Sequence, residues 1–173
     1  MILVSGHGRE AWLLRAVVRR LREEFAKLDL KVNEAKSRVV DLTQGEAFGF
    51  LGFTIRRLRS TRGTWWVQQM PAMKQRTVLR QKLREEFRRW GSQPVGRVIA
   101  VINPIVRGWV NDFRVGNAAR CCSFVKTWVE RRVRRHLMRA RGRRGFGWTR
   151  WSRAWLYMMR GLFNDYRVSW GRA

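Results

Sequence analysis

The stretch Ile102-Asn103-Pro104-Ile105-Val106-Arg107-Gly108-Trp109-Val110-Asn111-Asp112-Phe113-Arg114 decides the helical part of the fold. Asn103 can cap the first free backbone N–H groups of a helix, and Pro104 suits a first turn, where its missing N–H costs nothing. Apolar side chains that recur every four residues then predict a buried stripe, formed by Ile105, Trp109 and Phe113. We therefore predict a helix that starts at Asn103 and ends near Val115.

Elsewhere the apolar spacing predicts further helices and a few strands. The helices are expected over residues 9–28, 74–90, 95–102, 120–141 and 152–163. The strands are expected over residues 2–4, 37–42, 50–57 and 64–68, the last two as a hairpin. Pro71 separates the two patterns. The prediction is an α+β chain: an α/β region over residues 1–70 and a mostly helical region over residues 71–173.

The composition points to a polyanionic partner. The net charge is +26, of which residues 61–173 carry +21. Arginine greatly outnumbers lysine, which favours bidentate contacts to phosphate. Ten Trp and nine Phe provide a core that a disordered basic tail would lack. We therefore expect folded, salt-sensitive binding to nucleic acid.

Eight arginines lie within residues 131–144, with Glu130 as the acid beside them. Such a cluster repels itself unless a polyanion is bound. Of the three tryptophans that follow, Trp148, Trp151 and Trp155, we expect Trp148 to be the most exposed, because it follows the glycine-rich loop of residues 142–147. The candidate RNA-binding residues are Lys74, Arg107, Asn111, Arg114, Lys126, Arg131, Arg132, Arg134, Arg135, Arg139, Arg141, Arg143, Arg144, Trp148 and Arg150.

Other kinds of site are not indicated. His7 and His136 are isolated, and the adjacent Cys121 and Cys122 have no further Cys or His at a metal-ligand spacing, so we predict no metal site. The cysteines are expected to be plain thiols in a reducing compartment. No apolar run approaches the ~18 residues of a membrane span. We expect a cytoplasmic protein without a membrane partner.

Four separated motifs resemble group II intron reverse transcriptases. Leu30, Asn33, Glu34 and Lys36, followed by Phe50-Leu51-Gly52-Phe53, resemble the end of the family's palm. The Asn103–Arg114 stretch resembles its maturase-specific domain, as does Gly147-Trp148-Thr149-Arg150-Trp151-Ser152 with the aromatic residues behind it. The resemblance implies the end of a palm followed by a thumb and a maturase-specific domain.

The resemblance also implies roles for the palm residues. Lys36 would lie near the incoming nucleotide, and Phe50, Leu51, Gly52 and Phe53 would form the primer grip. The family's metal-binding Tyr-Ala-Asp-Asp turn would precede Ile2-Leu3-Val4, and the chain begins at Met1. We therefore expect no polymerase activity from this chain alone and a vestigial role for Lys36. Mg²⁺ is expected only for a complete polymerase or for the intron RNA.

The expected function is binding of group II intron RNA, with assistance to its folding and splicing. One alternative is half of a split RNA-directed DNA polymerase, which would bind a template–primer duplex and a separate N-terminal chain. A basic architectural RNA-binding protein and a decayed relic are the others. We also expect residues 71–165 to be more stable than residues 1–60, whose strands lack partners.

Overall fold

A computed structural model describes residues 11–33, 37 and 40–169 of the chain. It divides into two compact units between Asp41 and Leu42. In the first unit, α1 spans Ala11–Lys27 and confirms the helix predicted there. The predicted strand at residues 2–4 and the candidate Lys36 lie outside the described residues. Among the described residues of the segment 37–42 there is no strand, so that part of the prediction is wrong.

The second unit contains a small antiparallel sheet followed by helices, which confirms the α+β class. After a short 3₁₀ turn, η1, at Leu42–Gln44, the strands are β1 (Ala47–Phe50), β2 (Phe53–Arg59) and β3 (Trp65–Pro71). The sheet order is β1-β2-β3, with β2 in the centre. The helices are α2 (Met73–Arg89), α3 (Val95–Phe113) and α4 (Ala119–Arg139), and a π-helical turn, η2, spans Trp155–Met159.

The predicted hairpin is present, but its first strand starts later than expected. Phe50 pairs with Phe53, so Leu51 and Gly52 form a two-residue turn between β1 and β2. Their φ angles are +48° and +80°, as a type I′ hairpin turn requires at both central positions. The glycine therefore reverses the chain, which the strand pattern alone did not predict.

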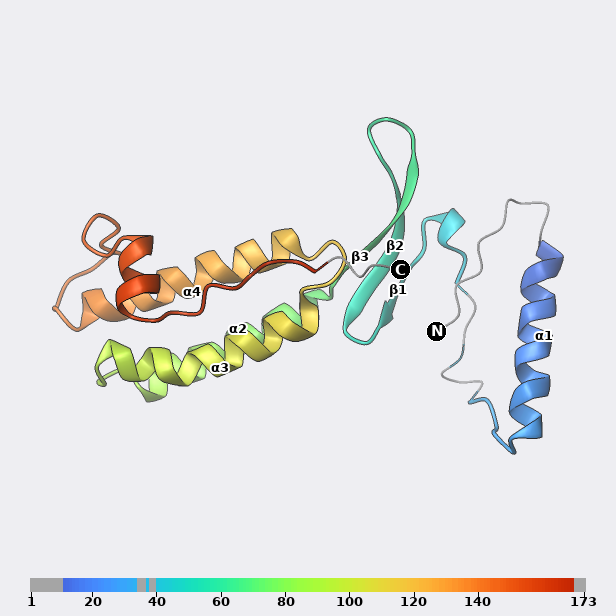
Figure 1. The fold of residues 1–173 in the computed structure, drawn as a ribbon, viewed down its shortest axis with the longest axis horizontal. Helices are drawn as coiled ribbons and strands as arrows, with labels where there is room; N and C mark the ends of the chain where they lie inside the picture. Colours follow the sequence, from blue (N-terminus) through green and yellow to red (C-terminus); the bar gives the residue numbers. More distant parts are fainter. Residues whose placement is uncertain (1–10, 34–36, 38–39, 170–173) are drawn as a thin grey trace. The chain divides into compact units, whose positions relative to one another are not determined.

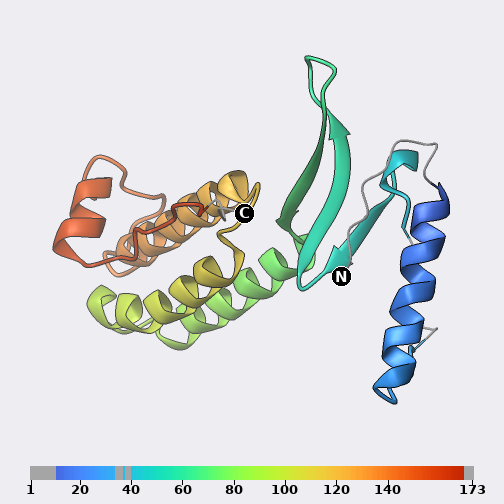
Figure 2. The same cartoon turned by 45° about the vertical axis from the view of Figure 1, so that its right-hand side comes forward.

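The helices α2, α3 and α4 lie alongside one another in both views of the chain (Figures 1 and 2). Their apolar faces enclose the core, in which α3 supplies the largest group of buried apolar side chains. This group consists of Val98, Ile99, Ile102, Val106, Trp109 and Val110. Ile105 and Phe113, expected in the buried stripe, pack against the core while only partly buried. The same core contains Leu79 and Leu83 from α2, and Val125, Val129 and Val133 from α4.

One helix, α3, replaces the two helices predicted over residues 95–115. Asn103 is not an N-cap, because α3 begins eight residues earlier at Val95 and passes through Pro104. The side chain of Asn103 instead bonds the backbone of a distant segment: Nδ2 donates to Gly161 O at 2.7 Å, and Oδ1 accepts from Phe163 N at 2.9 Å. The polar side chain thus joins α3 to the C-terminal segment.

The predicted C-terminal helix is much shorter in the structure. Helical geometry ends with η2 at Met159, and the chain then runs back along the bundle in an extended form (Figure 1). Ser169 N donates to Arg114 O at 2.8 Å, which fixes this segment at the end of α3. No described helix is long and apolar enough to cross a membrane.

Candidate nucleic-acid interface

One side of α4 carries a stripe of basic and aromatic side chains. Its members recur at three- or four-residue spacing, so they share one face of the helix. They are Arg120, Phe124, Trp128, Arg131, Arg135 and Arg139. All but the half-buried Trp128 are exposed. The opposite face of α4 holds the buried Val125, Val129 and Val133.

Helix α2 adds two arginines to this stripe. Arg80 lies with its guanidinium carbon 5.6 Å from the ring centre of Phe124 and 5.9 Å from that of Trp128. Arg132 lies over the same Trp128 ring at 5.1 Å. We define the α2–α4 basic face as Arg80, Arg84, Phe124, Trp128, Arg132, Arg135 and Arg139. Stacking on aromatic rings orders a guanidinium without neutralising its charge.

No carboxylate within the described residues forms an ion pair with the arginines of the α2–α4 basic face; the ion pairs of the second unit use Arg114, Arg134, Arg153 and Arg167. The pKa of Arg132 is lowered, first by burial and then by the charges of Arg135, Arg84, Arg139 and Arg80. These five cations therefore repel one another, and a bound anion would relieve the repulsion.

A small pocket opens within this face. It has a volume of about 30 Å³ and is lined by Phe87, Gly91, Arg132, Arg135, His136 and Arg139. His136 is buried, and its Nε2 lies 3.0 Å from Gln93 O. The pocket is large enough for a water molecule or a single phosphate oxygen. His136, which the sequence left without a role, thus joins α4 to the loop that precedes α3.

Arg134 is a correction to the predicted set of RNA-binding residues. Its side chain is 1% exposed, because it lies on the inner side of α4, four residues after Glu130. Its Nη1 lies 3.3 Å from Glu130 Oε2, and its Nε donates to Trp151 O at 2.9 Å. A buried guanidinium with these partners cannot reach a phosphate from the solvent. Arg134 therefore holds the interior together.

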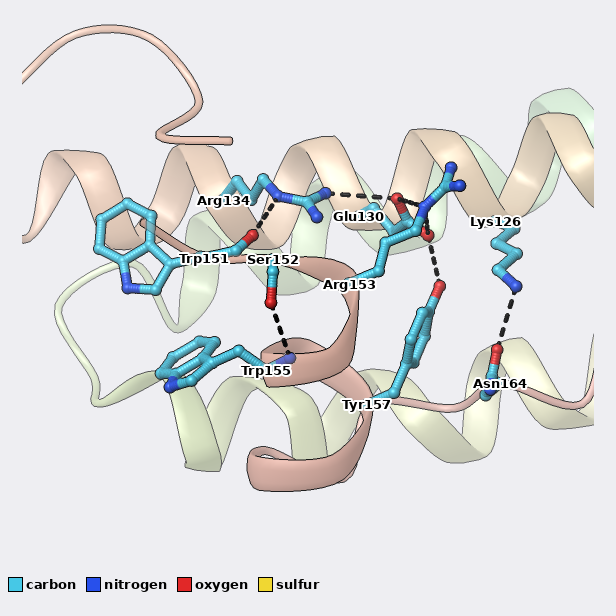
Figure 3. Close-up of polar contacts among 9 residues, drawn as sticks. All are labelled: Lys126, Glu130, Arg134, Trp151, Ser152, Arg153, Trp155, Tyr157 and Asn164. Carbon is cyan, nitrogen blue, oxygen red and sulfur yellow. Dashed lines mark hydrogen bonds and ion pairs between the residues drawn. The ribbon is translucent and has the colours of Figure 1, made fainter. Parts of the chain in front are cut away.

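Glu130 is the centre of this interior network (Figure 3). Arg153 Nε donates to both carboxylate oxygens at 3.1 Å, and Tyr157 Oη donates to Oε1. Burial alone would raise the pKa of Glu130, but the hydrogen bonds from Tyr157, Arg153 and Arg134 outweigh it and lower the pKa. Burial and the bond to Glu130 also raise the pKa of Tyr157. The network fixes the η2 region against α4.

The expectation for the three tryptophans is confirmed. Trp148 is 46% exposed, whereas Trp151 is 6% exposed and Trp155 is half-buried in the core. The arginines around the glycine-rich loop are also exposed: Arg141, Arg143, Arg144 and Arg150. The guanidinium of Arg135 lies over the ring of Phe146 at 5.1 Å, which brings the loop to the α2–α4 basic face.

The remaining candidate residues lie on other surfaces. Lys74, Arg107 and Asn111 are exposed on α2 and α3. Arg114 pairs with Asp165 at 3.1 Å, and Lys126 Nζ donates to Asn164 Oδ1 at 3.0 Å. Both of these cations hold the extended C-terminal segment. The predicted set did not include Arg80, Arg84, Phe124 and Trp128. Their i, i+4 spacing places each pair on one face of its own helix, but only the packing of α2 against α4 brings the two pairs together.

The predicted primer-grip residues form the β1–β2 turn and pack against the helices. The Phe53 and Phe113 rings are 5.3 Å apart, and Ala72 N donates to Gly52 O at 2.8 Å. A Cβ on Gly52 would lie 3.0 Å from the Phe113 ring. Leu51, at the tip, is 78% exposed. The turn is thus fixed to the end of α3, and its contact with a primer stays a prediction.

The structure brings together no metal-binding group in the part of the chain that it describes. Cys121 and Cys122 are free and buried in the core. Burial raises the pKa of both thiols, to about 11 for Cys122. These cysteines are therefore core residues with little thiolate at neutral pH.

Comparison with known proteins identifies the helical region. A comparison with curated proteins gave no match. Residues 76–155 match the family described as "Group II intron, maturase-specific domain". The matched segment contains nearly all of α2, all of α3 and α4, the glycine-rich loop and Trp148. The segment that carries the α2–α4 basic face therefore matches the group II intron maturase-specific domain.

Proposed function

We propose that this protein binds group II intron RNA through the α2–α4 basic face and assists the folding and splicing of that RNA. The observation that carries the proposal is a cluster of arginines that includes Arg80 and Arg132, stacked on aromatic rings, and that has no carboxylate partner in the described part of the chain. The family match supports the choice of RNA. In this role the RNA performs the splicing chemistry, and the protein stabilises its folded form.

The physical basis is the release of counterions. RNA helices that pack together bring phosphates close to one another, and arginines placed between them lower the repulsion. The guanidiniums of Arg80 and Arg132 are ordered by Phe124 and Trp128 before RNA arrives. Because these side chains are already positioned, less rotamer entropy is lost on binding. The basic face is therefore a preformed phosphate-binding surface.

The test compares two double variants with the same change of charge. Arg135→Glu/Arg139→Glu places two acids on the basic face, and Arg15→Glu/Arg19→Glu does so on the exposed surface of α1 at the same spacing. We expect the first variant to bind intron RNA at least about 10-fold more weakly. Its log–log salt dependence should fall by about 0.7–0.9 per lost phosphate contact. The α1 variant should stay close to wild type.

A second comparison separates recognition of the intron from general attraction to RNA. Wild-type protein is titrated with a group II intron RNA and with an unrelated structured RNA of equal length, across a salt series. A preference for the intron that survives high salt, together with faster splicing at low Mg²⁺, supports the maturase role. Equal affinities that fall together with salt would reduce the proposal to non-specific binding.

A further inference from the structure

We propose that Trp148 is a stacking platform for one unpaired base of the bound RNA, and that Arg134 holds its indole in place from the inside. This inference rests on the proposed function, since it names the kind of RNA element that the surface recognises. It differs from the role of the α2–α4 basic face, because the ligand is a base rather than a phosphate.

The contact between Trp148 and Arg134 is the first support. The guanidinium carbon of Arg134 lies 4.2 Å from the centre of the Trp148 ring, the shortest cation–π distance within the described residues. Arg134 is itself fixed by Glu130 and by Trp151 O. A guanidinium at this distance covers one face of the indole, and Trp148 nevertheless stays 46% exposed. One face of the indole is therefore covered by Arg134, which holds the ring in place, and the rest of the indole remains accessible to a ligand.

The loop that carries Trp148 is also fixed. Gly147 has φ +57°, and a Cβ there would lie 2.7 Å from the Trp151 ring. The Phe146 ring is tilted against the Trp148 ring, with centres 5.8 Å apart. Trp151 N donates to Gly147 O at 3.0 Å. Because the loop packs tightly on the buried Trp151, the position of the exposed indole is set before any ligand binds.

The surroundings of Trp148 favour nucleic acid over an apolar partner. Arg143, Arg144 and Arg150 are exposed in the same loop region, and residues 141–150 contain no acidic side chain. Exposed arginines attract the phosphates on either side of a base and repel basic partners. Alternation of an aromatic ring with arginines is the chemistry used to bind unpaired nucleotides. The charge pattern and the ring thus select the same ligand.

Stacking would supply a kind of selectivity that the basic face lacks. Phosphates are present in every RNA helix, whereas a base is free to stack on protein only in a loop, a bulge or a single strand. A single platform therefore favours an RNA helix with an unpaired nucleotide beside it. This component of binding should also resist salt, because stacking releases no counterions.

The experiment uses two RNA hairpins with the same stem. One has 2-aminopurine in a flexible loop, and the other is closed by a tight tetraloop with no free base. Stacking on an indole quenches 2-aminopurine fluorescence. We expect wild type to quench it at saturation, and Trp148→Leu and Trp148→Ala not to quench it. Affinity for the looped hairpin should fall about 5- to 150-fold in the last two, as expected for one lost base stack.

The controls separate this inference from the proposed function. Trp12→Ala removes a more exposed tryptophan from α1 and should change neither quenching nor affinity. Binding to the tight hairpin should be unchanged by the Trp148 variants and weakened by Arg135→Glu/Arg139→Glu. Full quenching by Trp148→Leu would overturn the platform while leaving the basic face intact. Trp148→Leu keeps a large apolar side chain, so the test stands even where Trp148→Ala does not fold.

Arg134 acts as a positioning residue and needs its own readout. Arg134→Lys keeps a cation for Glu130 but loses the planar group that lies over the indole. We expect this variant to bind the tight hairpin like wild type and to quench 2-aminopurine less completely. Quenching equal to that of wild type would show that Arg134 does not hold the ring.

Discussion

Glu130 and Arg134 lie one turn apart on α4 and form an ion pair of 3.3 Å, with side chains that are 0% and 1% exposed. A buried ion pair is not by itself a source of stability, because both charges lose their hydration. Here Tyr157, Arg153 and Trp151 O supply the hydrogen bonds that compensate this loss. The pair therefore joins α4 to the loop and to η2, and it depends on every partner.

The first prediction concerns removal of the charge on Glu130. Glu130→Gln leaves Arg134 buried without a counter-ion, and we expect the free energy of unfolding to fall by roughly 3–5 kcal/mol. Urea unfolding followed by circular dichroism measures the change. Glu85→Gln is the control, since Glu85 is exposed on α2, and its effect should stay within about 0.5 kcal/mol. Equal effects of the two substitutions would contradict the structural role.

The same residue predicts a dependence on pH. The pKa of Glu130 is lower in the folded protein than its usual value, so its contribution to stability is complete above the unfolded pKa of about 4.3. This contribution is lost as the pH falls through the folded pKa. The difference in unfolding free energy between wild type and Glu130→Gln should therefore shrink below about pH 4. A difference that stays constant from pH 7 to pH 3 would rule out this linkage.

The second prediction concerns Asn103, the residue that looked like a helix cap. Asn103→Ala removes the bonds to Gly161 O and Phe163 N, and we expect a loss of about 1–3 kcal/mol. Hydrogen exchange should become faster at residues 161–169. Asn103→Asp keeps the acceptor for Phe163 N but replaces the donor to Gly161 O by a carboxylate oxygen, so it should also lower the stability. Faster exchange at residues 103–106 instead would support the original capping interpretation.

Local patterns predicted most of the helical region correctly. Apolar side chains at helical spacing located α2 and α4 within a few residues, because burial of one face follows from that spacing. The Asn103-Pro104 pair led to the wrong prediction of a helix start. The side chain of Asn103 instead donates to Gly161 O, 58 residues away in the sequence. Nothing in the adjacent sequence signals that partner. The turn at Leu51 and Gly52 was not predicted for a different reason: it requires a positive φ at Leu51, and a positive φ is rare for leucine.

In the candidate site, too, local spacing was predictable from the sequence and long-range packing was not. The run of arginines in residues 131–144 correctly marked the charged part of α4, but it did not separate Arg134 from Arg135. Their angular positions on the helix differ by about 100°, so one faces Trp151 and the other faces solvent. Arg80 and Arg84 were overlooked because only the packing of α2 against α4 brings them to the run.

The third prediction uses two glycines of the same loop region. Gly142 and Gly147 both have positive φ, at +65° and +57°, so alanine is strained at either position by about 1–2 kcal/mol. A Cβ at Gly142 meets nothing within 4 Å, whereas one at Gly147 would meet the Trp151 ring at 2.7 Å. Gly147→Ala should therefore lower the melting temperature more than Gly142→Ala. Equal shifts would show that the loop moves away from Trp151 at little cost.

The last prediction concerns the two core thiols. The pKa of Cys122 is raised to about 11 by burial and by the neighbouring Cys121, so the reactive thiolate is scarce at pH 8. Both side chains are about 1% exposed, which also blocks the reagent. Iodoacetamide should modify neither thiol in the native protein and both in urea, as read by mass spectrometry. Because α4 must leave the bundle to expose them, the native rate should follow the unfolding equilibrium and rise in Glu130→Gln. Fast modification of the native wild type would show instead that α4 opens locally, without global unfolding.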